Sequence, residues 1–250
     1  MECFVIFVMA WCWCNATESK PQNVTHNMKK TLLLVLTICT IGILKAETTL
    51  TAQYPDKIKF KGNEYNLNSN PLEPYFEKYP DKRPQGGVMS TALWRGYVAH
   101  FEVVDGQLFV TDIKIEVHDE NSNESYPYKW ISAFKQVFPD GKKVKIDWYT
   151  GILILPHGKM VEYVHMGYAS TYSKYWLLEI ESGNFNEARK YKTKEFVQFK
   201  KRQFEEFQKT DEYRKLYADL KKNDEYGDEN FIKSFIADFV INYTSKFLTD

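Results

Sequence analysis

The chain has 250 residues, and its 33 basic and 33 acidic side chains give a formal net charge of zero at pH 7. A balanced charge argues against functions that need a global positive field, such as nucleic-acid binding or adsorption to anionic lipid. Aromatic residues make up 16% of the chain, and we expect most of them in the core and on pleated strands.

The first recognisable segment is a start signal inside the chain. Residues 28–49 read MKKTLLLVLTICTIGILKAETT, with two lysines, an apolar run over 32–44 and the small residue Ala46 before a polar one. This is the order of a secretory signal, and the run is shorter than the about 20 residues of a membrane span. We predict a cleaved signal peptide at 28–46 and an over-extended gene start at 1–27. A genuine leader over 1–46 is the alternative.

Cysteine usage agrees with export. All four cysteines, Cys3, Cys12, Cys14 and Cys39, precede the predicted cleavage site, so the exported chain would contain none. Such a chain has no disulfide, no thiol nucleophile and no cysteine-ligated metal. Lipidation at Cys39 is an alternative, although an isoleucine stands where a lipoprotein signal has a small residue. Together these features predict an exported bacterial protein, periplasmic or on the cell surface, with no membrane span after signal removal.

From 47 to about 185, runs of β-forming residues alternate with turn residues, a spacing typical of an antiparallel sheet. The pair Gly62-Asn63 predicts a hairpin within 58–67, and Asp105-Gly106 predicts a second hairpin within 93–117. The expected inward-facing residues of the second hairpin are Tyr97, Ala99, Phe101 and Val103 before the turn and Phe109, Thr111, Ile113 and Ile115 after it.

Two segments between the strands read as irregular. The proline-rich segment 70–87 predicts an ordered loop or lid with one helical turn at 73–79. A polar loop after 118 leads to a predicted short helix at 130–137, which Pro139 and Gly141 end.

A second set of strands follows. Thr150-Gly151 predicts a turn or bulge before the apolar run 152–155, and the segment 156–159, Pro-His-Gly-Lys, predicts a reversal of the chain.

After Gly183 the apolar period becomes helical, so we predict a β-rich domain at 47–185 and a helical segment at 186–250. Thr210 and Asp228 are the expected N-caps of the second and third helices. The expected buried residues are Phe196, Phe199, Gln203 and Phe207 in the first helix and Phe231, Ile232, Phe235, Ile236 and Phe239 in the last. The predicted fold class is α+β: an antiparallel, strongly curved or barrel-like β-sheet packed by the C-terminal helices.

No catalytic motif accompanies this pattern. His157 and His165 can approach across the predicted reversal, yet two imidazoles are fewer than the three or four ligands of a zinc site. Ser170 lacks the glycine-flanked elbow of a serine nucleophile. We therefore predict no catalytic residue, no metal and no cofactor.

The densest unusual stretch is 162–178, where tyrosines and one tryptophan crowd around Gly167. Such flat amphipathic side chains stack on sugar or peptide while their polar ends form hydrogen bonds. We predict a recognition surface with Arg95 as the anchor for an anion, and a packed strand pair is the alternative. The candidate ligand- or partner-binding residues are Arg95, His165, Tyr168, Ser170 and Tyr172.

Two stretches carry a family resemblance: ALWRGYVAHFEVVDGQLFVTDI and DWYTGILILPHGKMVEYVHMGYASTY. They resemble an uncharacterised family of exported or cytosolic bacterial proteins that share an RGYxAx[FW]E strand, a W[FY]xGxL hairpin and an HxGYxS segment. The resemblance covers about 54–182, so the predicted helical segment lies outside it. The resemblance implies no activity.

Three function classes remain open. The leading one is a non-enzymatic binding module of the bacterial envelope that recognises a protein partner, in the manner of an immunity protein that occludes a toxin. The second is a glycan-binding or glycan-cleaving protein that uses the tyrosine-rich sheet face. The third is a structural envelope protein that assembles through its helices.

Overall fold

The structure is a computed structural model, and it describes residues 51–222 and 228–250. The predicted gene start at 1–27, the signal peptide at 28–46 and all four cysteines lie outside the described residues. The described residues belong to one compact unit, so the strands and helices below share their cores.

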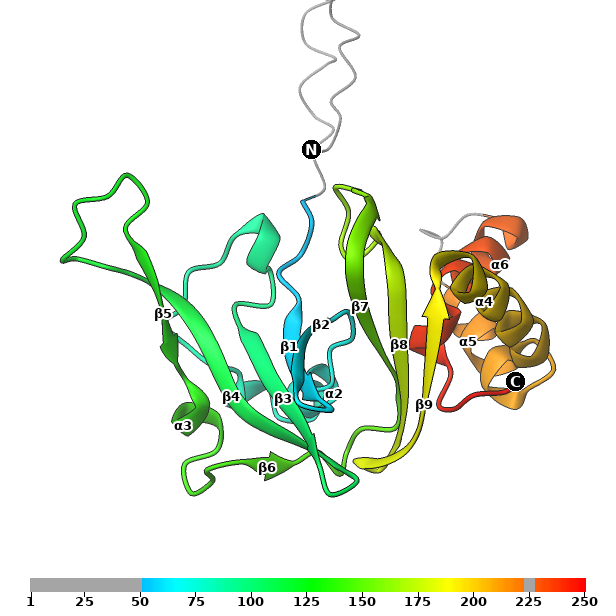
Figure 1. Ribbon diagram of the computed structural model, residues 1–250, viewed down its shortest axis with the longest axis horizontal. Coiled ribbons are helices and arrows are strands. Elements are labelled where there is room, and N and C mark those ends of the chain that lie inside the picture. Colours follow the sequence, from blue (N-terminus) through cyan, green and yellow to red (C-terminus); the bar gives the residue numbers. More distant parts are fainter. Residues whose placement is uncertain (1–50, 223–227) are drawn as a thin grey trace, which may run out of the picture. The chain divides into compact units, whose positions relative to one another are not determined.

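In the described residues, nine strands form one mixed sheet (Figure 1). They are β1 (Asp56–Phe60), β2 (Asn63–Leu67), β3 (Val98–Val104), β4 (Gln107–His118), β5 (Tyr128–Ser132), β6 (Val144–Lys145), β7 (Gly151–Glu162), β8 (Thr171–Glu181) and β9 (Asn184–Lys192). The strand order is β2-β1-β3-β4-β9-β8-β7, and β5 and β6 also pair with β4.

The α+β class is confirmed, but the sheet is neither strictly antiparallel nor a closed barrel. β1 runs parallel to β3, because β2 returns the chain to the end where β1 began and the connection over 68–97 starts β3 from that same end. Among the described residues no ladder joins the terminal strands β2 and β7. They approach through two hydrogen bonds: Asn68 N donates to Ile154 O at 2.8 Å, and Ile154 N donates to Ser69 Oγ at 3.1 Å. β2 ends at Leu67, before a ladder can form.

Both predicted hairpins are present, but the first turn lies one residue earlier than predicted, because Asn63 already pairs with Phe60 as the first residue of β2. The β1–β2 turn consists of Lys61 and Gly62, and the β3–β4 turn consists of Asp105 and Gly106. All four turn residues have positive φ, between 48° and 76°, which matches the right-handed twist of the flanking strands.

The expected inward alternation along β4 is wrong in its first half. A register shift at His100 and Phe101 leaves Thr111 as an extra residue in β4. The bulge reverses the face, so the buried side chains before it are Leu108 and Val110, and not Phe109 or Thr111. After the bulge, Ile113 and Ile115 point inward as predicted.

The predicted reversal at 156–159 is also wrong, because β7 continues through it to Glu162 and pairs with β8 along its length. Register shifts after His157 absorb the irregular residues as bulges. Pro156 fits here since β7 is a terminal strand of the sheet, where a missing N–H costs no ladder bond.

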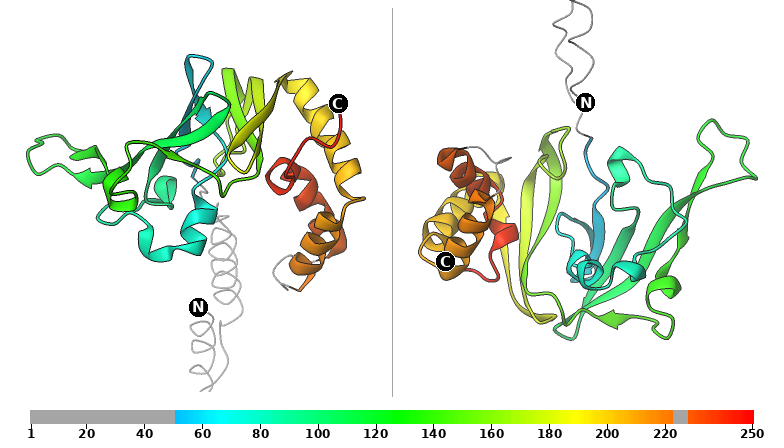
Figure 2. Two further views of the ribbon diagram at one scale, coloured as in Figure 1. Left: turned by 90° about the horizontal axis from the view of Figure 1, so that it is seen from below. Right: turned by 180° about the vertical axis from the view of Figure 1, so that it is seen from behind.

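Two hydrophobic cores lie on opposite faces of β7 and β8. Leu153 and Leu155 belong to the core inside the curled sheet, whereas Ile152 belongs to the core shared with the C-terminal helices. Figure 2 shows these helices beside β7, β8 and β9. Burial on both faces explains why 152–155 is apolar without alternation. The helices are α2 (Glu73–Lys78), α3 (Phe134–Val137), α4 (Thr193–Phe207), α5 (Asp211–Lys221), α6 (Glu229–Asp238) and α7 (Val240–Tyr243), with 3-10 turns at Pro80–Lys82 and Thr91–Leu93.

The helical tail largely follows the sequence pattern. The stripe of α4 is buried as predicted, and Thr210 and Asp228 cap α5 and α6 by accepting from backbone N–H groups. Helices begin at Thr193, later than residue 186, because β9 continues to Lys192. Ile232 and Ile236 of α6 are buried as predicted. Phe231 and the C-cap residue Phe239 are exposed and Phe235 is half-buried, so the predicted phenylalanine row is not the buried face.

The predicted helix at 130–137 shortens to α3, since Tyr128–Ser132 pairs with β4 as β5. The predicted helical turn at 73–79 is present as α2. None of the helices in the described ranges has the length and apolar character needed to cross a bilayer.

Candidate functional site

The structure brings together two of the five candidate residues, Arg95 and Tyr168. The Arg95 guanidinium donates to Tyr168 Oη at 3.1 Å, to Tyr54 O at 3.0 Å and to Asp56 Oδ2 at 2.8 Å. Tyr168 in turn donates to Asn70 Oδ1 at 3.0 Å. Arg95 is only 3% exposed, so this group is a buried polar network and not an open anchor for an anion.

The pKa shifts of Arg95 and Tyr168 are those of a buried network. Burial lowers the pKa of Arg95, but the charge of Asp56 and its hydrogen bond, with smaller contributions from Tyr168 and Tyr97, together outweigh burial and hold that pKa above its ordinary value. Burial raises the pKa of Tyr168 well above its ordinary value, although Arg95 opposes the shift, so Tyr168 stays protonated and able to donate. Burial also raises the pKa of Asp56, against the opposing effects of Arg95 and of the hydrogen bond from Ala99 N. The network therefore pairs a buried carboxyl with a charged guanidinium and a neutral phenol.

The other three candidates lie apart from Arg95 in their contacts. His165 is exposed and stacks edge-on against Tyr163, with ring centroids 4.5 Å apart. Ser170 Oγ accepts from Val164 N at 3.0 Å and so closes the loop between β7 and β8. Tyr172 packs against the helix-facing core. The predicted recognition surface is thus divided between a buried network, a loop closure and a core edge.

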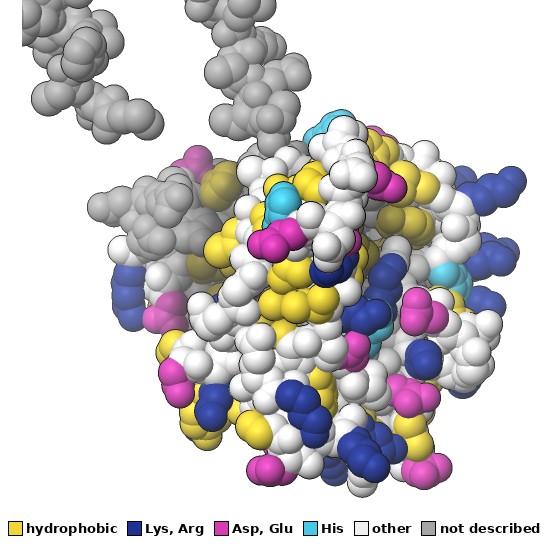
Figure 3. Space-filling view, turned by 90° about the vertical axis from the view of Figure 1, so that its left-hand side faces the viewer, with side chains coloured by type: hydrophobic (Ala, Val, Ile, Leu, Met, Phe, Trp, Pro, Cys, Tyr) yellow, Lys and Arg dark blue, Asp and Glu magenta, His cyan; other side chains and the backbone are white. Residues whose placement is uncertain are grey.

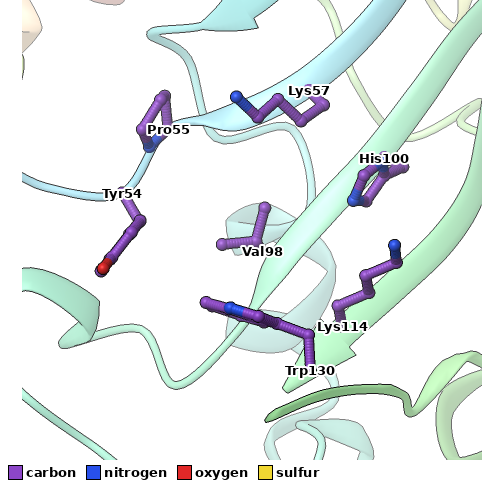
Figure 4. Close-up of a pocket in the computed structure, with 7 residues that line it drawn as sticks. All are labelled: Tyr54, Pro55, Lys57, Val98, His100, Lys114 and Trp130. Carbon is purple, nitrogen blue, oxygen red and sulfur yellow. The ribbon is translucent and has the colours of Figure 1, made fainter. Parts of the chain in front are cut away.

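A pocket that the sequence did not predict lies on the outer face of β1, β3, β4 and β5 (Figure 4). Its volume is about 340 Å³, at the lower end of the range of about 300–1,000 Å³ typical of small-molecule sites. Strand alternation turns Lys57, Val98 and His100 outward, because their neighbours Asp56 and Ala99 face inward. The lining residues are Tyr54, Pro55, Lys57, Val98, His100, Lys114 and Trp130.

One part of the pocket wall is aromatic. Tyr54 and Trp130 meet edge to face with ring centroids 5.9 Å apart, yet they remain 46% and 39% exposed. Two further exposed apolar side chains, Met89 and Trp94, lie on the loop whose residue Ala92 accepts a hydrogen bond from Tyr54 N. Figure 3 views the side of the molecule with the β4–β5 arm, where hydrophobic side chains are exposed beside charged ones.

The remaining polar lining is basic. Lys57, His100 and Lys114 contribute it, and no acidic side chain lines this pocket in the described part of the chain. Burial lowers the pKa of His100, and the positive charge of Lys114 lowers it further, against the opposing effect of Asp112 and Glu64. His100 is therefore neutral at pH 7 and gains its charge only in acid.

The sequence gives little indication of this pocket. His100 and Lys57 occupy outward positions of two predicted strands, but nothing in the sequence places those strands side by side in parallel. Trp130 falls in a segment that reads as a helix and folds as β5. Within the described residues no group of three or more His, Cys, Asp or Glu side chains is arranged to hold a metal ion.

Comparison of the chain with models of protein families, with curated proteins and with solved structures finds no match.

Proposed function

We propose that the chain is an exported, non-enzymatic binding module of the bacterial envelope, and that it recognises a protein partner through the outer face of β1, β3, β4 and β5. The observation that supports this most is the pocket of about 340 Å³ with Tyr54 and Trp130 exposed at its edge. Exposed aromatic side chains around a concave site are typical of the anchor regions of protein interfaces. An immunity-like protein that occludes a toxin is one concrete form of this proposal.

The experiment uses the full chain with a C-terminal tag, expressed in its native cell envelope and captured under gentle conditions. The captured partner is purified, and its affinity is measured by direct titration against the wild-type chain, Trp130→Ala and the control Met160→Ala. Met160 is an exposed apolar residue of β7 outside the pocket. We expect Trp130→Ala to weaken binding about tenfold or more, as loss of an interface anchor does, and Met160→Ala to leave it unchanged. Equal affinities of wild type and Trp130→Ala would refute the proposal that the partner binds this surface.

Flat exposed rings also suit sugars, which keeps a glycan ligand as a second candidate. If glycans from the envelope bind the wild-type chain and the Trp130→Ala variant loses that binding, the partner is a glycan and the protein-partner proposal fails.

Exposure of Phe231 on α6 and of Phe239 directly after it favours a third candidate, assembly of the chain through its helices. Sedimentation over a hundredfold range of concentration distinguishes it, because assembly through this face requires association that Phe231→Ser removes.

A further inference from the structure

The pocket is divided into two chemically different parts (Figure 4). Tyr54, Pro55 and Trp130 form an apolar, largely aromatic part, and Val98 lies between them and the basic side chains. Lys57, His100 and Lys114 form the basic part. A ligand that contacts both parts must combine a flat apolar body with a negative charge close to it.

The two lysines are available for a ligand. Neither Lys57 nor Lys114 takes part in an ion pair among the described residues. Lys57 Nζ donates to the neutral Asn66 at 2.6 Å, and the cross-strand neighbours of Lys114, Val98 and Ser132, carry no charge. An anion that enters the pocket therefore does not have to displace a carboxylate of the chain.

One acidic side chain beside the pocket already has hydrogen-bond partners. Asp112 lies opposite His100 in the ladder, and its Oδ1 accepts from Ser132 Oγ at 2.6 Å and from Ile113 N at 2.9 Å. The charge of Asp112 lowers the positive potential of the basic part, but its side chain does not line the pocket.

The donor set favours a carboxylate over a phosphate. Phosphate sites typically use arginine forks and clusters of free backbone N–H groups. No arginine lines the pocket in the described residues, and the strands beneath it pair in the β1–β3, β3–β4 and β4–β5 ladders. Two ammonium groups and one imidazole suit a singly charged group.

We propose that the pocket binds a carboxylate that stands next to an aromatic ring on the partner protein. A C-terminal aromatic residue and an aromatic residue beside an acidic one both supply this chemistry. The ring packs against Tyr54 and Trp130, and the carboxylate reaches Lys57 and Lys114. This inference rests on the proposed function, since it names the group by which the partner is recognised.

The test compares small probes that differ only in charge. N-acetyl-phenylalanine and its neutral amide are titrated into the full chain, and binding is followed by NMR shifts of the pocket residues. We expect the acid to bind about tenfold more tightly than the amide, the usual worth of one charge-assisted hydrogen bond. N-acetyl-phenylalanyl-glutamate amide, whose only carboxylate is on a side chain, distinguishes the two sources: the tighter of the two acids identifies the one the pocket prefers.

Matched variants locate the effect. Lys114→Met removes one ammonium and keeps the length of the side chain, so it should abolish most of the preference for acid over amide. Lys59→Met is the control, because Lys59 lies on the same strand and face as Lys57 but does not line the pocket. Thermal melts of both variants establish that they are folded.

Three results would overturn the inference: equal affinity for acid and amide, equal effects of Lys114→Met and Lys59→Met, or tighter binding of phenyl phosphate than of either acid. Any of these can occur while the partner still depends on Trp130, in which case the proposed function survives and only its chemistry is wrong. A strong preference for acids in a chain that captures no partner protein would instead remove the proposed function.

Discussion

Replacement of Arg95 by methionine tests whether this residue is structural. Asp56 is fully buried, and its two oxygens accept from Arg95 at 2.8 Å and from Ala99 N at 2.8 Å. Arg95→Met leaves the carboxylate in the interior with one backbone donor and no counter-charge. The variant also frees Tyr54 O and Tyr168 Oη from their guanidinium donor.

Removal of one partner from a buried ion pair costs about 3–5 kcal/mol, because the remaining charge is not solvated. For a chain of about this size, each kcal/mol lowers the melting temperature by about 2–4 °C, so we expect a fall of about 6–20 °C. The double variant Asp56→Asn/Arg95→Met should recover part of the loss, since it leaves no unpaired charge and keeps an acceptor for Ala99 N.

Thermal unfolding followed by circular dichroism measures the effect, and Lys129→Met is the matched control. Lys129 pairs with Asp119 at a similar distance, 2.9 Å, but the pair is exposed, so its loss should change the melt very little. An Arg95→Met melt within about 2 °C of wild type would refute the structural role and return Arg95 to the candidate binding residues.

Three further outcomes follow from the backbone and the histidines. Gly183→Ala should destabilise the chain more than Gly106→Ala in urea titration, because both glycines have φ near 70° but only at Gly183 would the added methyl collide with a backbone carbonyl. Thr210→Ala should cost about 1 kcal/mol by the same titration, through loss of the α5 N-cap. Burial lowers the pKa of both His100 and His157, so the unfolded chain binds more protons in mild acid; stability should fall as pH drops below about 6.5, and a double His→Gln variant should lose that dependence.

Local features of the fold could be predicted because their causes are local. A turn such as Asp105-Gly106 and caps such as Thr210 and Asp228 depend on a few adjacent residues. The stripe of α4 is equally local, since a helix repeats its own face every few residues.

Features that depend on a distant strand could not be read in this way. The bulge at Thr111 is defined only by the register of β4 against β3. Trp130 is a strand residue because its segment pairs with β4. Arg95 and Tyr168 are in contact in the structure, but the sequence did not indicate that Arg95 is buried. Their burial depends on Asp56, which lies far from both in the sequence.

That buried network nevertheless bears on the pocket, because it lies directly behind the pocket wall. Arg95 holds the carbonyl of Tyr54, and Asp56 joins β1 to the backbone of β3 between the outward residues Val98 and His100. Tyr168 should therefore act as a positioning residue through Arg95, without touching the ligand. We expect Tyr168→Phe to remain folded and to bind N-acetyl-phenylalanine about twofold to fivefold more weakly than wild type, with the loss of one hydrogen bond to the guanidinium as the cause. Ser170→Ala is the control, since Ser170 closes a loop that does not line the pocket. Equal affinities of Tyr168→Phe and wild type would mean that the network stabilises the sheet but does not shape the site.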